Sequence, residues 1–248
     1  MEQAEGLAAW AALLADRTRA AFCLALMDGR AWTVGELARH AGVAVSTASE
    51  HADRLVAGGL LTQYRQGRHR YLRVAGPDVA ALIEAVAAAG TPRTPEVRSM
   101  SSAHRMRSLA VARTCYDHLA GTVGVAVADA MTEHGLVERA RGLALTERGA
   151  ARLREIGVVV EAAGKRPALR DCVDWTERRI HLAGSVGAAI CRHAFDHGWI
   201  RRVGTGRAVK VTDEGADAFG RHLGVLIEPA ARDGRGVVHA APAGVRLP

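Results

Sequence analysis

The sequence has little of several features that define particular classes of protein. Aromatic residues make up only 4% of its 248 residues, so a core must be built from alanine, leucine and valine. No run of about 18 apolar residues occurs, which argues against a membrane-spanning helix.

The four cysteines are too few and too scattered for a disulfide framework. With 49% apolar and 24% charged residues, the chain is typical of a globular protein. Its acidic N-terminus is unlike a signal peptide, so we expect a cytoplasmic location and no membrane partner.

Lysine is nearly absent as well, yet the chain is basic. Only Lys165 and Lys210 are lysines, and arginine supplies the remainder of 33 basic residues, against 26 acidic ones. The resulting net charge of +7 suits a polyanionic partner, although arginine bias can also reflect the base composition of a genome. The position of the charge is therefore more informative than its sum. No acidic residue occurs over 54–77, where five arginines lie.

The first 90 residues predict a winged helix-turn-helix. Helical patterns cover about 7–15, 16–27, 33–40 and 46–57, and Thr33 with Glu36 forms a capping-box pattern. Two alternating segments, 60–66 and 69–74, predict a hairpin, and a helix is expected over 78–89. In such a motif the second helix enters the major groove and a basic hairpin contacts the phosphate backbone. The residues expected to contact DNA are Ser46, Thr47, Ser49, His51 and Arg54 on the helix, and Arg65, Arg68 and Arg70 on the hairpin.

This region resembles the arsenic-repressor-like (ArsR) family of winged-helix transcription regulators. The resemblance implies a homodimer that is paired through the first helix and the helix after the wing. It also implies repression by occupancy of a double-stranded DNA operator, relieved by a signal. The matching segments are 33–42 (TVGELARHAG), 45–51 (VSTASEH), 55–61 (LVAGGLL) and 65–71 (RQGRHRY).

One departure from the ArsR pattern limits what the resemblance implies about the signal. The thiol metal site of that family needs close cysteines at the start of the first helix of the motif, where this chain has Val34, Gly35, Glu36 and Leu37. Soft metals require thiolates at a suitable spacing. We therefore expect no metal at that position.

The second half of the chain contains an internal repeat. Residues 113–117 (RTCYD) resemble 170–174 (RDCVD), and 118–126 (HLAGTVGVA) resemble 181–189 (HLAGSVGAA). His-Gly pairs and capping threonines then follow in the same order in both copies. We expect domains at 1–90 and 101–227, a linker at 91–100 and a disordered tail at 228–248, with the repeats at about 113–153 and 170–221. The expected fold is mostly α with small β-hairpin wings (α+β), and the second half consists of two degenerate winged-helix-like repeats.

The repeats are expected to pack and to sense a signal rather than to contact DNA. The helices expected after each His-Leu-Ala-Gly segment are rich in alanine, valine and glycine and lack base-reading side chains. Small residues beside the few aromatic ones are typical of an apolar ligand pocket, although tight packing without a ligand explains them equally well. A small-molecule inducer would lie against Tyr116, His118, Trp175, His181 and Trp199.

The cysteines of the second half allow a different kind of signal. We expect Cys115 and His118 to lie on one face of a helix, with Cys172 and His181 at the equivalent positions and Cys191 near His193. These residues could bind a metal or respond to oxidation. Their spacing matches no recognised zinc pattern, and buried cysteine usually acts as a small apolar residue. We therefore assign no metal ligand and no cofactor.

The sequence favours a dimeric, sequence-specific repressor over other functions. No dinucleotide-binding, phosphate-binding or nucleophile motif occurs in its required context, so no catalytic residue is assigned and a DNA-binding enzyme is disfavoured. A metal-responsive or thiol-responsive regulator that uses Cys115, Cys172 and Cys191 is the main alternative. A non-specific DNA-coating protein is a further one, and it would show little sequence preference.

Overall fold

The structure is a computed structural model that describes residues 1–90, 100–140, 142–161, 166–204, 206–228 and 238–241. The chain forms two compact units, Met1–Ile83 and Glu84–Pro248, and the division falls within helix α5 (Pro77–Ala89). Apart from residue 100, the expected linker lies outside the described residues. No helix among the described residues is long and apolar enough to cross a membrane.

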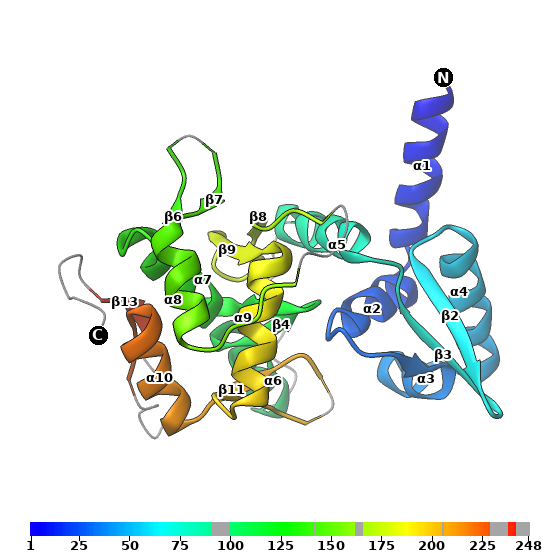
Figure 1. Cartoon of the computed structure of the whole chain (residues 1–248). Helices are drawn as coiled ribbons and strands as arrows, with labels where there is room; N and C mark the ends of the chain where they lie inside the picture. Colours follow the sequence, from blue (N-terminus) through cyan, green and yellow to red (C-terminus); the bar gives the residue numbers. More distant parts are fainter. Residues whose placement is uncertain (91–99, 141, 162–165, 205, 229–237, 242–248) are drawn as a thin grey trace. The chain divides into compact units, whose positions relative to one another are not determined.

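The first unit is a winged helix-turn-helix, in which the helices lie around a small antiparallel sheet of strand order β1-β3-β2 (Figure 1). Helix α1 begins earlier than the sequence pattern predicts, and the short strand β1 was not predicted. The other elements begin within about one residue of their expected positions. The elements are α1 (Glu2–Leu14), α2 (Arg17–Leu26), β1 (Trp32–Thr33), α3 (Val34–Ala41), α4 (Val45–Ala57), β2 (Leu61–Gln66) and β3 (His69–Val74).

Local interactions explain why these segments end where they do. The Asp16 carboxylate accepts a 2.9 Å hydrogen bond from the backbone N–H of Arg19 and caps α2. Thr33 and Glu36 form the predicted capping box at the start of α3. At the other end of α3, Gly42 has a φ of +70°, a left-handed conformation that glycine adopts without strain. The expected start and end of this helix are confirmed.

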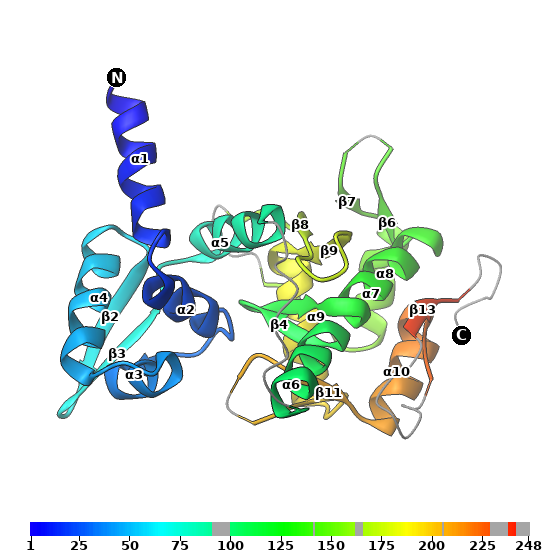
Figure 2. The same ribbon diagram turned by 180° about the vertical axis from the view of Figure 1, so that it is seen from behind.

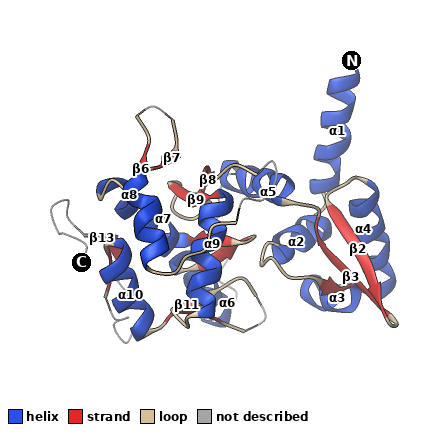
Figure 3. Ribbon diagram, viewed as in Figure 1, coloured by secondary structure: helices blue, strands red, loops and turns tan. Residues whose placement is uncertain are grey.

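The second unit contains the two repeats, and they have the same order of elements: hairpin, helix, hairpin, helix (Figure 3). The first repeat consists of β4 (Arg113–Cys115), β5 (His118–Ala120), α7 (Gly121–Glu133), β6 (Val137–Glu138), β7 (Ala144–Leu145) and α8 (Glu147–Glu155). The second consists of β8 (Arg170–Val173), β9 (Ile180–Ala183), α9 (Gly184–Asp196), β10 (Ile200–Arg202), β11 (Val209–Val211) and α10 (Asp213–Leu223). Helix α6 (Met100–Val111) precedes them, and strands β12 (Val225–Ile227) and β13 (Val238–Ala240) follow.

The hairpin at the start of each repeat corrects a prediction. Cys115 and His118 were expected on one helical face, but they lie directly opposite each other on strands β4 and β5. Cys172 and His181 form the equivalent pair on β8 and β9. Each His-Leu-Ala segment is a strand, and the helix begins only at the following glycine. The segments are too short for a period-2 pattern to distinguish them from a helical turn.

The chain end also differs from the expected disordered tail, because strand β13 lies within it. β13 pairs antiparallel with β12, from Val225 opposite Ala240 to Ile227 opposite Val238. The partner strand lies just outside the segment that was expected to be disordered, so local composition did not reveal the pairing. Residues 229–237 and 242–248 lie outside the described part of the chain.

The two repeats exchange packing partners, so neither has a complete core alone. Helix α7 of the first repeat packs against β9 of the second, α9 packs against β5, and β5 and β9 contact each other (Figures 1 and 2). The core draws on both repeats, with Val123 and Met131 from α7 and Val186 and Ile190 from α9. Because packing crosses between the repeats, the duplicated sequence folds as one unit.

Close backbone approaches make specific glycines necessary in the second unit. A Cβ atom at Gly215, in the first turn of α10, would overlap the carbonyl group of Trp199. We predict that Gly215→Ala lowers the free energy of unfolding by about 1–3 kcal/mol, because backbone atoms must move to accept the methyl group. Chemical denaturation of the full chain, followed by circular dichroism, measures this change.

The matched control for this prediction is Gly206→Ala. A Cβ atom at Gly206 would meet nothing within 4 Å, so the control variant should unfold like the parent chain. Equal stability of the two variants would contradict the packing that we describe for α10.

Candidate functional site

Helix α4 presents a polar face that no other described element covers. Ser46, Glu50 and Arg54 recur every four residues and are exposed. Ala48, Ala52 and Leu55 form the opposite, buried face. Of the residues expected to contact DNA, Ser46 and Arg54 lie on the exposed face, whereas Thr47 and Ser49 are half-buried at its border. Glu50 was not in the predicted set, although its i+4 spacing from Ser46 places it on the same face.

His51 faces the interior of the unit more than the expected DNA groove. Its side chain is only 16% exposed, and Nδ1 lies 3.7 Å from the Asp16 carboxylate. The ring also meets Phe22 of α2 edge-on, at 6.4 Å between ring centroids. The helical period explains this position, because residue 51 is three residues after Ala48 and four before Leu55 and so lies beside the buried face. The assignment of His51 to base contact remains a prediction, and the geometry favours Glu50 in that role.

The wing carries exposed arginines around a tight turn. Strands β2 and β3 pair from Leu61 opposite Val74 to Gln66 opposite His69, and Gly67 at the turn has a φ of +58°. Arg65 and Arg68 are exposed. Arg70 is half-buried and forms a 2.7 Å ion pair with Asp53 of α4. Arg65 and Arg68 therefore remain the best-placed wing residues for phosphate contact, whereas Arg70 connects the wing to α4.

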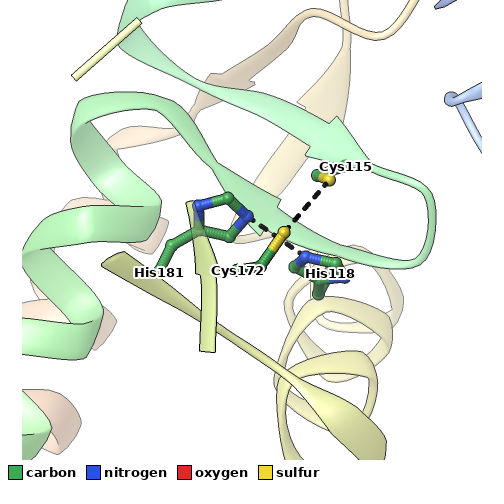
Figure 4. A group of neighbouring side chains, drawn as sticks. All are labelled: Cys115, His118, Cys172 and His181. Atoms are coloured by element: carbon green, nitrogen blue, oxygen red, sulfur yellow. Dashed lines mark hydrogen bonds between the residues drawn. The ribbon is translucent and has the colours of Figure 1, made fainter. Parts of the chain in front are cut away.

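A second candidate site lies between the two repeats of the C-terminal unit. Cys115, His118, Cys172 and His181 are all buried, and their ligand atoms lie within 4.8 Å of one another (Figure 4). The two thiol sulfurs are 4.0 Å apart, and the two Nε2 atoms are 3.1 Å apart. Each hairpin contributes one cysteine and one histidine from opposite positions of its strands. The sequence suggested the residues, but only the hairpin pairing shows why they converge.

A carboxylate lies on the outer side of each histidine of this cluster. Nδ1 of His118 lies 3.3 Å from Asp117, which accepts hydrogen bonds of 2.6 and 3.0 Å from Arg166. Nδ1 of His181 lies 3.5 Å from Asp174, whose carboxylate forms a 3.0 Å ion pair with buried Arg113. The two Nε2 atoms therefore point toward the cysteines and each other.

The pKa values of the two thiols in the cluster are shifted in opposite directions. A hydrogen bond from the Cys115 thiol, followed by those from His118 and His181, lowers the pKa of Cys172 far below its usual range. Burial raises the pKa of the Cys115 thiol well above its ordinary value. Burial also raises the pKa of Asp117, but hydrogen bonds from His118 and Arg166 outweigh it and hold that pKa at about 2.

The remaining residues that the sequence assigned to a ligand do not join this cluster. The Trp199 ring packs against His193, Phe219 and His222, and it is 8% exposed. The Arg113 guanidinium lies over the Trp175 ring, with its Cζ atom 4.9 Å from the ring centroid. Tyr116 occupies the β4–β5 turn with a φ of +61°.

Cys191 also lies outside the cluster. Burial in α9 raises the pKa of its thiol to about 12. Such a thiol is poorly suited to redox chemistry, because the thiolate is the reactive form.

Comparison with known proteins assigns the chain to a family. Residues 14–64 match a family described as a helix-turn-helix domain. Over 218 residues, the chain is 38% identical to the uncharacterized HTH-type transcriptional regulator YdfF of Bacillus subtilis (strain 168). The alignment covers 87% of this chain and 96% of that protein. This chain belongs to the HTH-type transcriptional regulators. Because the alignment covers so much of the regulator, it includes most of the C-terminal unit as well.

Two solved structures resemble part of the regulator. One is the homodimeric winged helix-turn-helix DNA-binding domain of Mb0332 from Mycobacterium bovis, which is 30% identical to this chain. The match covers 34% of this chain and 78% of that domain, with a TM-score of 0.32. The other is the cadmium metal-sensor CMTR from Mycobacterium tuberculosis, which is 32% identical to this chain. The match covers 36% of this chain and 93% of that protein, with a TM-score of 0.29.

The exposed wing leads to a prediction about salt dependence. We expect Arg68→Ala with Arg70→Ala to weaken binding to all DNA sequences about equally. The plot of log affinity against log salt should become shallower by roughly one unit for each phosphate interaction that the substitutions remove. Because Arg70 is paired with Asp53, most of the change should come from Arg68, which the single variants can separate.

The control is Arg148→Ala, which removes an exposed arginine from α8 in the C-terminal unit and so makes the same change in net charge as either single variant. Its salt dependence should match that of the parent. An altered sequence preference at an unchanged slope would mean that the wing reads bases instead.

Proposed function

We propose that this regulator is a homodimeric, sequence-specific repressor that occupies a double-stranded DNA operator until a signal releases it. The observation that carries the proposal is the exposed polar face of α4 beside a wing with exposed arginines, in a chain that belongs to a family of transcription regulators. Side chains on such a helix can reach base edges in the major groove. Arginines on the wing would hold the phosphate backbone and set the register.

Exposed apolar residues on the first and fifth helices support a dimer. Helix α1 has no buried residue, and Leu7 is 71% exposed. On α5, Leu82 and Val86 are each 47% exposed. These are the two helices through which the ArsR resemblance implies pairing. A twofold dimer would present its α4 helices to half-sites about 34–36 Å apart, one turn of DNA.

The second unit is the better candidate for sensing than for reading DNA. Helix α7, which precedes a hairpin as α4 precedes the wing, has nine buried residues where α4 has three. A helix buried on most of its surface cannot also lie in a groove. We infer that this unit receives the signal and acts by binding rather than by catalysis. An inducer would have to bind the DNA-free state more tightly than the bound state in order to release the operator.

Two kinds of signal remain: an apolar small molecule, and a metal ion or an oxidant that acts on the cysteines. The geometry supports the second kind better. An apolar inducer against Tyr116, Trp175 and Trp199 has less support, because Trp175 and Trp199 already have packing partners. A metal ion or thiol oxidation has more, because Cys115 and Cys172 lie 4.0 Å apart with two histidines beside them. We keep a small-molecule inducer as the second candidate.

The reading of bases by α4 can be tested with DNA selected from a random pool by the full chain. A repressor should enrich one motif with twofold symmetry and bind it at least about a thousandfold more tightly than random DNA. A DNA-coating protein would enrich no motif. We predict that Ser46→Ala and Glu50→Gln each reduce discrimination by about 1–3 kcal/mol at particular base pairs of this motif.

The variant His51→Gln tests which face of α4 contacts the bases. With His51 turned toward α2, this variant should keep the base preference of the parent. An altered preference in His51→Gln together with an unchanged one in Glu50→Gln would show that the buried and exposed faces are assigned wrongly.

The dimer can be tested by charge on the exposed helices. We expect Leu7→Glu with Leu82→Glu to make the protein monomeric in analytical ultracentrifugation, because both charges would be buried in the paired helices. Operator affinity should fall, since a monomer can occupy only one half-site. Val203→Glu, at a residue 41% exposed in the C-terminal unit, is the control and should stay dimeric. A double variant that sediments like the parent would place the interface elsewhere.

A further inference from the structure

The four-residue cluster between the repeats has the composition of a metal site. Two thiol sulfurs and two imidazole nitrogens face one another inside the unit, where each of these residues is at most 5% exposed (Figure 4). Zinc sites with two cysteines and two histidines use this ligand set, and tetrahedral sulfur and nitrogen ligands together favour zinc over harder cations.

The sulfur-to-sulfur and nitrogen-to-nitrogen distances of the cluster are close to those of a tetrahedron around one ion. Typical bonds of about 2.3 Å from zinc to sulfur and about 2.0–2.1 Å to nitrogen give tetrahedral edges of about 3.8 Å between sulfurs and about 3.3 Å between nitrogens. The corresponding distances here are 4.0 Å for Cys115 to Cys172 and 3.1 Å for His118 to His181. Each differs from its ideal value by about 0.2 Å, and the four ligand atoms all lie within 4.8 Å of one another.

The surroundings of the histidines also match those of metal ligands. A histidine that binds a metal through one ring nitrogen usually donates the other N–H to a carboxylate, which fixes the ring and its tautomer. Asp117 and Asp174 occupy this position toward His118 and His181, at 3.3 and 3.5 Å from Nδ1. An arginine holds each carboxylate in turn, Arg166 on Asp117 and Arg113 on Asp174. Both Nε2 atoms are thereby directed into the cluster.

We propose that Cys115, His118, Cys172 and His181 bind one zinc ion, which joins the two repeats of the C-terminal unit. With four protein ligands and no open position, the site has the closed coordination of a non-catalytic zinc site. Each repeat supplies half of the ligands, so the ion would bind tightly only when the β4–β5 and β8–β9 hairpins are together. Metal binding would therefore stabilise the folded C-terminal unit. The proposal goes beyond the DNA-binding function and does not depend on it.

The metal content of the full chain tests this assignment directly. Protein purified under reducing conditions should contain one zinc per chain, and removal by a chelator should lower its melting temperature until zinc is restored. Cobalt(II) added to the metal-free chain should give the strong visible bands of a tetrahedral ion and the charge-transfer absorption of two thiolates. Neither measurement involves DNA, so its outcome is separate from that of the proposed function.

Variants identify the ligands. Cys115→Ser removes one ligand from the first repeat and His181→Gln removes one from the second, and each should abolish the one-to-one zinc content. Cys191→Ser changes another buried cysteine of the same unit and should retain zinc. Asp117→Asn should keep the fold and weaken zinc affinity about 10–100-fold, because Asp117 touches a ligand and not the ion. This last variant keeps the test decisive if a ligand variant fails to fold.

Three outcomes would overturn the proposal. The first is a reduced, metal-free parent chain that takes up no zinc or cobalt. The second is a cobalt spectrum that persists unchanged in both ligand variants. The third is a reduced chain that takes up no zinc but joins Cys115 to Cys172 on oxidation, which would make the cluster a thiol redox pair.

Discussion

The C-terminal unit depends on one constraint, the meeting of two β-hairpins whose buried surfaces carry polar side chains. Burying a polar or charged group without a partner is costly, so a charged group there is stabilised by pairing. Asp174 shows how this is met, because it accepts a 2.6 Å hydrogen bond from the backbone N–H of Gly121 and pairs with Arg113. Arg113, fully buried, also pairs with Glu84 at 3.1 Å. These contacts fix the position of each hairpin relative to the other repeat.

Duplication makes this junction nearly symmetric, and the symmetry has a chemical result. Each copy brings one cysteine, one histidine and one aspartate to the junction, and the two sets face each other. A single copy would offer only two ligands, which is too few to hold an ion tightly. Two copies that exchange packing partners offer four. The ligand set proposed for zinc is therefore a product of the arrangement of the repeats.

The two units use the same kind of supersecondary structure in opposite ways. In the N-terminal unit, α4 buries a narrow stripe and leaves polar residues exposed, as a helix that reads DNA must. In the C-terminal unit, α7 and α9 are mostly buried and carry glycines where neighbouring chain segments approach. Gly124 is one of these, since a Cβ atom there would lie 2.5 Å from the carbonyl oxygen of Leu119. The composition of each helix thus separates a surface for recognition from one for packing.

The sequence by itself determined the features that depend on neighbouring residues. The capping box of Thr33 and Glu36, the wing turn at Gly67 and the winged helix-turn-helix could all be predicted, because local hydrogen bonds and periodicity specify them. The internal repeat was also visible as similarity between two segments. Helical period alone could have placed His51 beside the buried face of α4 and Glu50 on the exposed one.

Only the tertiary structure decided how Cys115, His118, Cys172 and His181 are arranged. Read as a helix, the first two would share a face, but they lie opposite each other on a hairpin. A strand of three residues has too little pattern to be recognised, and its pairing is stabilised by the other repeat, about 60 residues away. The convergence of four ligand atoms within 4.8 Å follows from that long-range packing, which local sequence does not encode.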